Sequence, residues 1–158
     1  MSDFDTAKKL LSDWKGSSYL LGNGVLDKIG PIVAGIAKNV ALIYTEYPGV
    51  DVYVNRIKKN LTDAGVKDIS VIEGAKANAP KEDLQRIADL LKLSNAEMVV
   101  SFGGGSTIDA AKAAEVLRTL GGTVDQYFGT NLVTAAMEKQ GKKLHPHMAI
   151  QTAASTGA

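Results

Sequence analysis

Gly103, Gly104 and Gly105 stand together between an apolar run, "MVVSF", and a helix-like pattern, "STIDAAKAAEVL". A turn without side chains lets an anion approach the backbone, and the free N–H groups and positive dipole end of the following helix then point at that anion. Ser106 or Thr107 can cap this helix, and a hydroxyl there can reach a phosphate oxygen. The pattern therefore predicts a phosphate or pyrophosphate bound at the start of a helix.

The spacing of this glycine turn separates it from two better known phosphate-binding motifs. Ile108 stands where GxGxxG has its third glycine, and no stretch of the chain matches GxxxxGK[ST]. The alternative is a tight turn between a strand and a helix, with no ligand. Three consecutive glycines cost more backbone entropy than a plain turn requires, so we favour the phosphate site.

A second loop of small residues, "IQTAASTGA", closes the chain from Ile150 to Ala158. It too follows an apolar run, so both loops are expected at the same edge of a parallel sheet. Thr152, Ser155 and Thr156 offer hydroxyl groups there, and two such loops around one cleft could hold a dinucleotide diphosphate. The alternative is an ordinary flexible terminus, which we disfavour because the preceding run reads as a buried strand.

The elements that position these loops follow from hydrophobic periodicity. Runs at 39–45 and 97–102 are nearly continuous in apolar residues, as in parallel strands that are covered on both faces. Helical stripes separate the strand-like runs, and the alternation predicts a doubly wound α/β fold with a mostly parallel, Rossmann-like sheet. We expect buried strands at 39–45, 68–73, 97–102 and 147–152, and helices at 25–36 (bent at Gly30-Pro31), 50–61, 80–91 and 108–120.

Residues 123–143 are longer and more polar than a simple connector. One interpretation makes them a surface excursion with one or two short helices, and the other makes them part of a cleft wall. We favour the surface excursion.

Composition limits the function classes. The chain has 158 residues with 45% hydrophobic and 22% charged residues, which predicts one domain spanning 1–158. A net charge of +1 with no long basic block argues against nucleic acid as a partner. We expect no membrane span and no signal peptide, because no apolar run has the required length. The absence of cysteine fits a cytoplasmic protein.

The motifs together resemble one enzyme family. "GGGSTIDAAKA" looks like the GGGSxxDxAK signature of the iron-containing (group III) alcohol dehydrogenases, and "AIQTAASTGA" resembles their IPTTxGTGSE segment. "NVALIYTE", "YLLGNGVLDKIG" and "GAKANAPKEDL" occur in the expected order. The resemblance covers nearly all of the chain but only the amino-terminal half of the family. It implies that the family's all-helical, metal-binding domain is absent here.

The resemblance also implies roles for particular residues. Gly104, Gly105 and Ser106 would hold the pyrophosphate, and Asp109 would line the cofactor cleft. The remaining implied cofactor-binding residues are Asn78 near the adenosine end, Thr152 and Thr156 on the opposite loop, and Glu46 at the adenine ribose. Gln151, Ala153, Ser155 and Ala158 depart from the family pattern, so contacts from that loop are less secure than those from the glycines.

The cofactor implied is NAD, because a carboxylate at Glu46 accepts hydrogen bonds from a free 2′-hydroxyl and repels the 2′-phosphate of NADP. A solvated turn carboxylate beside Pro48 is an equally weighted alternative for Glu46. A divalent metal, iron or zinc, is implied only through the carboxyl-terminal region of the family. His145 and His147 are interpreted as a surface loop pair rather than metal ligands, since no nearby carboxylate is obvious.

Two kinds of function follow. The first is the cofactor-binding part of an NAD-dependent, metal-dependent alcohol dehydrogenase, an oxidoreductase acting on small alcohols or aldehydes. This chain has no catalytic or metal residues assigned and is expected to be inactive alone. The alternative is a stand-alone nucleotide- or phosphate-binding module. The sequence leaves a homo-oligomer open.

Overall fold

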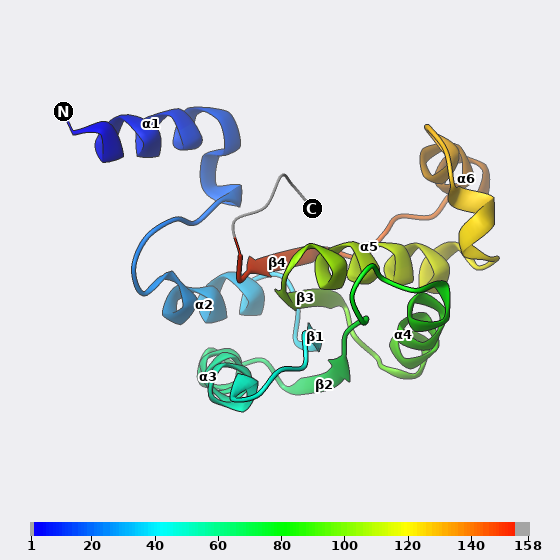
Figure 1. Cartoon of the computed structure of the whole chain (residues 1–158), viewed down its shortest axis with the longest axis horizontal. Helices are drawn as coiled ribbons and strands as arrows, with labels where there is room; N and C mark the ends of the chain where they lie inside the picture. Colours follow the sequence, from blue (N-terminus) through cyan, green and yellow to red (C-terminus); the bar gives the residue numbers. More distant parts are fainter. Residues whose placement is uncertain (1, 154–158) are drawn as a thin grey trace.

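A four-stranded parallel sheet forms the centre of the molecule, as a computed structural model covering residues 2–153 shows (Figure 1). The strand order is β2-β1-β3-β4, which confirms the expected α/β, parallel-sheet fold. The strands are β1 (Asn39–Tyr44), β2 (Asp68–Glu73), β3 (Met98–Gly103) and β4 (His147–Gln151).

Helices cover both faces of this sheet. Ala41 and Ile43 of β1 pack with α4 (Lys81–Leu93) and α5 (Gly105–Leu120), whereas Val40 and Leu42 pack with α2 (Ile29–Ala34) and α3 (Val50–Asp63). This alternation follows from the two-residue period of a strand, and it makes the sheet doubly wound. The order of the strands places the ends of β1 and β3 side by side at the centre of one edge.

The outer strands are less buried than the sequence suggests. β3 is buried along its whole length and β1 through its four central residues, but β2 and β4 are only partly covered. The expectation of four buried strands is therefore wrong for β2 and β4. An outer strand has a neighbour on one side only, and apolar content alone does not reveal its place in the sheet.

The helix expected at 25–36 is divided. A 3₁₀ helix, η2 (Val25–Lys28), leads into α2 at Ile29, so the change does not fall at Gly30-Pro31. Gly30 instead allows α2 and α3 to pack closely, because a Cβ at this position would lie 2.4 Å from the Asn60 carbonyl oxygen. The backbone N–H of Gly30 donates a hydrogen bond to the Asn60 side chain at 2.6 Å.

Two segments lie outside the central layers. Residues 123–143 contain two short helices, η3 (Val124–Tyr127) and α6 (Leu132–Gln140), where one or two were expected. At the other end, α1 (Asp3–Lys15) leads into η1 (Gly16–Ser18) and buries none of its residues. Figure 1 shows α1 standing apart from the sheet and its covering helices. No helix within residues 2–153 has the length and apolar character to cross a membrane.

Candidate functional site

The glycine turn joins β3 to α5 at the carboxyl edge of the sheet. Gly103 is the last residue of β3, Gly104 is the N-cap, and Gly105 opens the helix three residues earlier than expected. No side chain caps this helix start among the described residues, so the prediction that Ser106 or Thr107 caps it is wrong. Uncapped N–H groups at the start of a 16-residue helix are the donors that an anion accepts from.

Gly103 and Gly104 lack a side chain for different structural reasons. A Cβ on Gly103 would lie 2.1 Å from Thr45 Oγ1 and 2.9 Å from Thr107 Cβ, so Gly103 is required for packing. A Cβ on Gly104 would meet nothing within 4 Å. The φ of Gly104 is −82°, which any residue adopts, so the missing side chain leaves open space rather than permitting an unusual backbone.

Thr107 fills the space behind the turn. Its side chain is buried, and its hydroxyl lies 2.6 Å from the Thr45 hydroxyl at the end of β1. Gly74, just after β2, is also close, since a Cβ there would lie 3.0 Å from Thr107 Cγ2. Thr107 is therefore a packing residue that ties three strand ends together, and sequence reasoning missed its partners Thr45 and Gly74.

The loop after β2 bends over the start of α5. The backbone N–H of Asn78 donates a hydrogen bond to Ser106 Oγ at 3.2 Å. Asn78 and Ala79 have φ values of 66° and 47°, in the left-handed region that asparagine tolerates better than most residues. The structure thus brings together Asn78 and Ser106, two of the residues predicted to contact the cofactor.

A hollow of about 420 Å³ opens beside this contact, and Asn78 and Asp109 supply polar groups to it. Asp109 is exposed on α5 and lies 3.5 Å from the ammonium group of Lys112. The rest of the lining is mainly apolar and comes from the loop after β2, from α4, from α5 and from the segment after α5: Ala79, Leu84, Ala113, Val116, Leu117, Val124, Tyr127, Phe128, Gly129 and Val133. Residues 123–143 therefore form a wall of this hollow, which fits the cleft-wall alternative better than the plain surface excursion that we favoured.

Glu46 lies in the loop after β1, two residues beyond the end of the strand, and β1 is the neighbour of β3 in the sheet. Its side chain is exposed, and hydrogen bonding to its carboxylate, followed by burial, raises the pKa of the Tyr44 phenol. Glu46 is thus placed at the same edge as the glycine turn but one strand away from it.

The loop after β4 lies against the glycine turn, as expected. Gln151 pairs with Gly103 in the sheet register, and the Thr152 N–H donates a hydrogen bond to the Gly103 carbonyl at 3.1 Å. Thr152 is exposed at this point, while Thr156 lies outside the described residues. Gly104, Gly105, Ser106, Asn78 and Thr152 therefore surround one point of the carboxyl edge.

The histidines have partners that the sequence did not suggest. His145 approaches Glu115, whose Oε1 accepts hydrogen bonds from the His145 backbone N–H at 2.9 Å and lies 2.8 Å from Nδ1, so the expectation of no nearby carboxylate is wrong. Glu115 is buried and also lies 2.7 Å from Arg118. His147 is partly buried on β4, with Nε2 2.8 Å from Ser101 Oγ. Within residues 2–153 no group of three potential ligands is placed to hold a metal ion.

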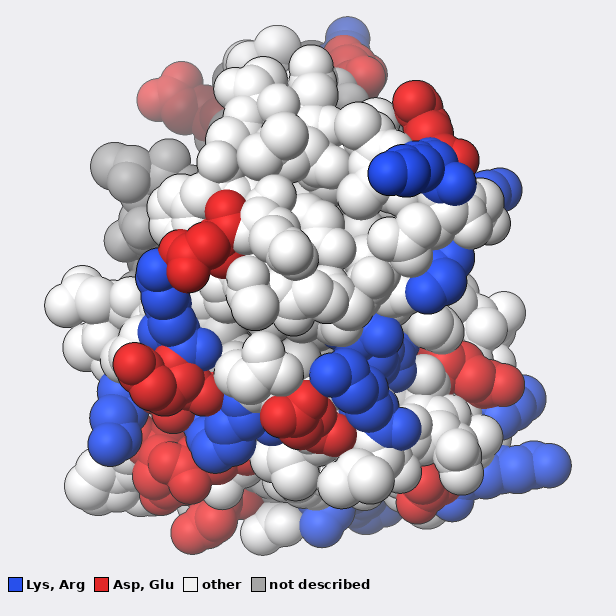
Figure 2. All heavy atoms as spheres, turned by 90° about the vertical axis from the view of Figure 1, so that its right-hand side faces the viewer, with Lys and Arg blue, Asp and Glu red and all other residues white. Residues whose placement is uncertain are grey.

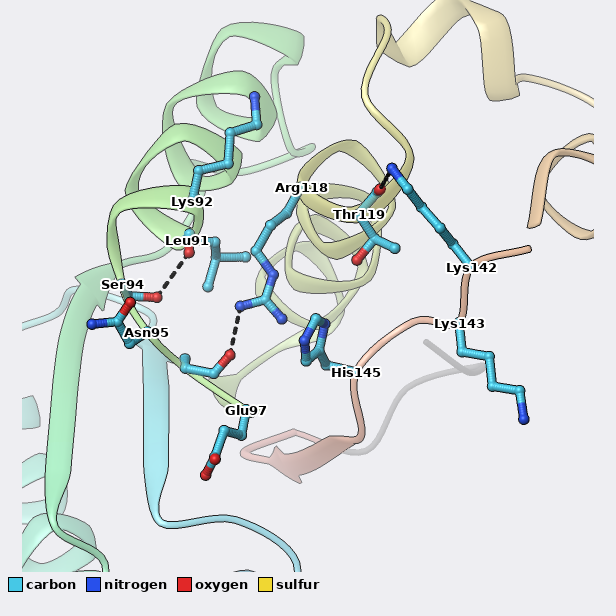
Figure 3. Close-up of a pocket in the computed structure, with 11 residues that line it drawn as sticks. Leu91, Lys92, Ser94, Asn95, Glu97, Arg118, Thr119, Lys142, Lys143 and His145 are labelled. Carbon is cyan, nitrogen blue, oxygen red and sulfur yellow. Dashed lines mark hydrogen bonds between the residues drawn. The ribbon is translucent and has the colours of Figure 1, made fainter. Parts of the chain in front are cut away.

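A larger hollow, of about 650 Å³, lies at the opposite edge, where β3 and β4 begin (Figure 3). Two of its basic groups are engaged with the chain itself: Lys142 donates to the Thr119 carbonyl at 2.7 Å, and Arg118 donates to the Ala96 carbonyl at 2.9 Å. Figure 3 shows Lys92 and Lys143 extending away from Arg118. Positive charge at the carboxyl-terminal ends of helices is favourable in itself, so these residues stabilise α5 and its surroundings.

The face of the molecule at the right-hand side of Figure 1 carries charges of both signs. Figure 2, which views the molecule from the right of Figure 1, shows acidic and basic side chains interspersed around a largely uncharged centre. A nucleic-acid surface is instead a patch or stripe of positive charge.

A doubly wound parallel sheet with a glycine turn and an open helix start at its carboxyl edge is an arrangement that recurs among α/β folds. Residues 16–158 match the family model described as iron-containing alcohol dehydrogenase, and the chain belongs to that family.

Several named relatives share this sequence similarity. An NAD-dependent methanol dehydrogenase from Bacillus methanolicus is 29% identical over 140 residues, covering 88% of this chain and 35% of the relative. Alcohol dehydrogenase 4 from Saccharomyces cerevisiae (strain YJM789) is 32% identical, covering 87% of this chain and 34% of the relative. The chain therefore spans about a third of the length of these curated relatives.

Solved structures show the same fold. An alcohol dehydrogenase from Oenococcus oeni superposes with a TM-score of 0.72 at 24% identity, covering 87% of this chain and 34% of that chain. The NADH-dependent butanol dehydrogenase A from Thermotoga maritima gives a TM-score of 0.69 at 23% identity, covering 85% and 32%.

Proposed function

We propose that residues 1–158 form the dinucleotide-binding domain of an NAD-dependent, metal-dependent alcohol dehydrogenase. The observation that carries the proposal is the turn at Gly104, where an uncapped helix start faces open space between the loops of Asn78 and Thr152. Family membership supports the same function, since the matched relatives include an NAD-dependent methanol dehydrogenase.

In this proposal the residues of the chain bind and orient the cofactor. The N–H groups that follow Gly104, together with Gly105 and the Ser106 hydroxyl, bind the pyrophosphate, because its negative charge complements the helix dipole. Asn78 and Asp109 line the adjoining hollow, and Thr152 and Thr156 approach from the loop after β4. Glu46 accepts hydrogen bonds from the adenine ribose. The nicotinamide, when bound, accepts or donates the hydride.

The metal of the family does not fit the described part of this chain, where no three ligands converge. We therefore assign no step through a metal to residues 2–153, and iron or zinc enters the proposal only through the longer relatives. The substrate class proposed is a small alcohol or aldehyde, with NADP a less favoured cofactor than NAD. A cytoplasmic location is supported by the absence of cysteine, and self-association into a homo-oligomer is part of the proposal without a defined interface.

Nuclear magnetic resonance titration of the ¹⁵N-labelled chain with NADH and with ADP-ribose tests this function. We expect dissociation constants between roughly 10 µM and 1 mM, with the largest shifts at the amides of residues 103–109, 78 and 152. Shifts that cluster at the hollow near Arg118, or none at millimolar cofactor, would contradict the proposal. Binding of inorganic pyrophosphate but not of NADH or ADP-ribose would favour a phosphate-binding module.

A further inference from the structure

The ends of β1 and β2 place a tyrosine and a glutamate side by side. Tyr44 and Glu73 are partners in the parallel register, so their side chains leave the sheet on the same face. That face is the one covered by α3, because Tyr44 packs against the cluster that contains Val50 and Val54. Glu73 is exposed and Tyr44 is half-buried, which makes the tyrosine the better fixed of the two.

Three carboxylates influence the Tyr44 hydroxyl. Hydrogen bonding to Glu46 and burial raise the pKa of Tyr44 most, and the negative charges of Glu73 and Asp51 act in the same direction. Glu46 comes from the loop after β1, Glu73 from the end of β2, and Asp51 from the first turn of α3. The charge at this corner of the carboxyl edge therefore comes from more residues than Glu46 alone.

The backbone at the end of β2 is held in place. The N–H of Gly74 donates to the Tyr44 carbonyl at 2.8 Å, which continues the strand pairing past Glu73. Arg86, on α4 and hence on the opposite face, donates to the carbonyls of Glu73 at 3.0 Å and Gly74 at 2.7 Å. A Cβ on Gly74 would lie 2.9 Å from the Tyr44 carbonyl oxygen, so the absence of a side chain at Gly74 lets the two strand ends approach this closely.

We propose that Glu73 is a second specificity-determining residue for the cofactor. The inference rests on the proposed function, in which the adenine ribose lies at Glu46. A free 2′-hydroxyl donates a hydrogen bond to a carboxylate, whereas a 2′-phosphate brings about two negative charges at pH 7 next to both glutamates. Glu73 therefore adds to the rejection of NADPH without contributing a contact to NADH.

Charge-neutral variants at the two positions test this role. We measure the dissociation constants of NADH and NADPH for the full chain, for Glu73→Gln, for Glu46→Gln and for the double variant, with Glu138→Gln on α6 as the matched control. Glu73→Gln is expected to lower the dissociation constant of NADPH by roughly 3–10-fold and to change that of NADH by less than about twofold, as the loss of one nearby charge predicts. The double variant is expected to bind NADPH more tightly than either single variant does. Glu73→Asp is expected to retain the preference for NADH over NADPH.

The salt dependence of binding separates this role of Glu73 from a purely structural one. Because the Debye length falls from ~10 Å at 0.1 M salt to ~3 Å at 1 M, the preference for NADH in the unmodified chain is expected to shrink in high salt.

The outcomes are distinguishable. If NADH binds and Glu46→Gln changes the preference but Glu73→Gln does not, Glu73 has no part in specificity. If neither cofactor binds the unmodified chain, the proposed function itself fails, and this inference fails with it.

Discussion

The hydroxyl groups of Thr45 and Thr107 meet at 2.6 Å beneath the glycine turn, although 62 residues separate them in the sequence. This contact joins the end of β1 to the first turn of α5, and the missing side chain of Gly103 makes room for it. The start of α5 therefore has a fixed position relative to the ends of the strands, as a binding site for a pyrophosphate group requires.

A double-mutant cycle measures this contact. Thr107→Val and Thr45→Val each keep the shape of the side chain and remove one partner, so each is expected to lower the free energy of unfolding by about 1 kcal/mol. The double variant is expected to cost little more than either single variant, because no hydroxyl is then left unpaired. Urea unfolding followed by circular dichroism gives the three values. Additive losses would mean that the two hydroxyls do not interact in solution.

Gly103 and Gly104 are expected to respond in opposite ways to substitution. Gly103→Ala forces a Cβ against Thr45 and Thr107, and it is expected to lower the free energy of unfolding by about 2–3 kcal/mol. Gly104→Val has space for its side chain and is expected to cost no more than about 1 kcal/mol as a poorer N-cap. It should nevertheless abolish NADH binding, because the valine occupies the space that the diphosphate needs.

Thermal unfolding and NADH titration of both variants check these expectations. Gly122→Ala, in a glycine pair after α5, is not a suitable control, since the Gln126 amide oxygen blocks its Cβ and its φ is positive. Gly35→Ala at the end of α2 is the better one, with an ordinary φ and a nearest contact of 3.3 Å. A folded Gly104→Val that binds NADH undiminished would show that the glycines serve only the turn.

The sequence predicted the position of the glycine turn and the loop that faces it, because strand runs and helical stripes have local periodicity. It did not predict which glycine is needed for packing, since that depends on Thr45, which approaches Gly103 only after the sheet has formed. Glu115 was missed for the same reason. A charged residue on a helix reads as exposed, and its burial depends on Arg118 one turn away and on His145, 30 residues later.

His147 is expected to make stability depend on pH. Burial, followed by the charge of Lys112, lowers the pKa of His147 in the folded chain below its ordinary value of about 6.5. The unfolded chain therefore binds the proton more readily, so stability is fully present above about pH 6.5 and falls as the pH drops toward the folded-state pKa. Glu115 opposes this shift but is the smallest of the three influences.

Urea unfolding at pH 8, 6.5 and 5.5 checks the titration. His147→Gln keeps a polar group near Ser101 but cannot titrate, so its free energy of unfolding should fall less between pH 8 and 5.5 than that of the unmodified chain. Parallel pH profiles for the two proteins would assign the acid sensitivity to other groups.

The last prediction concerns catalysis by the chain alone. We expect no alcohol oxidation by the 158-residue protein, with or without added iron or zinc. Metal-assisted hydride transfer needs a metal held beside both the alcohol oxygen and the nicotinamide. The two histidines of the chain are already engaged, His145 with Glu115 and His147 with Ser101, and both belong to the end of β4 opposite the glycine turn. A metal bound there would be at the wrong edge of the sheet for a cofactor at Gly104.

NADH formation from a panel of short alcohols and diols, with each metal added in turn, tests this expectation, and elemental analysis reports the metal content. NADH binding by the same preparation shows that the protein is competent to hold the cofactor, so that a lack of turnover reflects missing catalytic groups. Metal-dependent turnover that disappears in His145→Ala or His147→Ala would overturn the assignment. The histidines would then be ligands rather than partners of Glu115 and Ser101, and the chain would be a small enzyme in its own right.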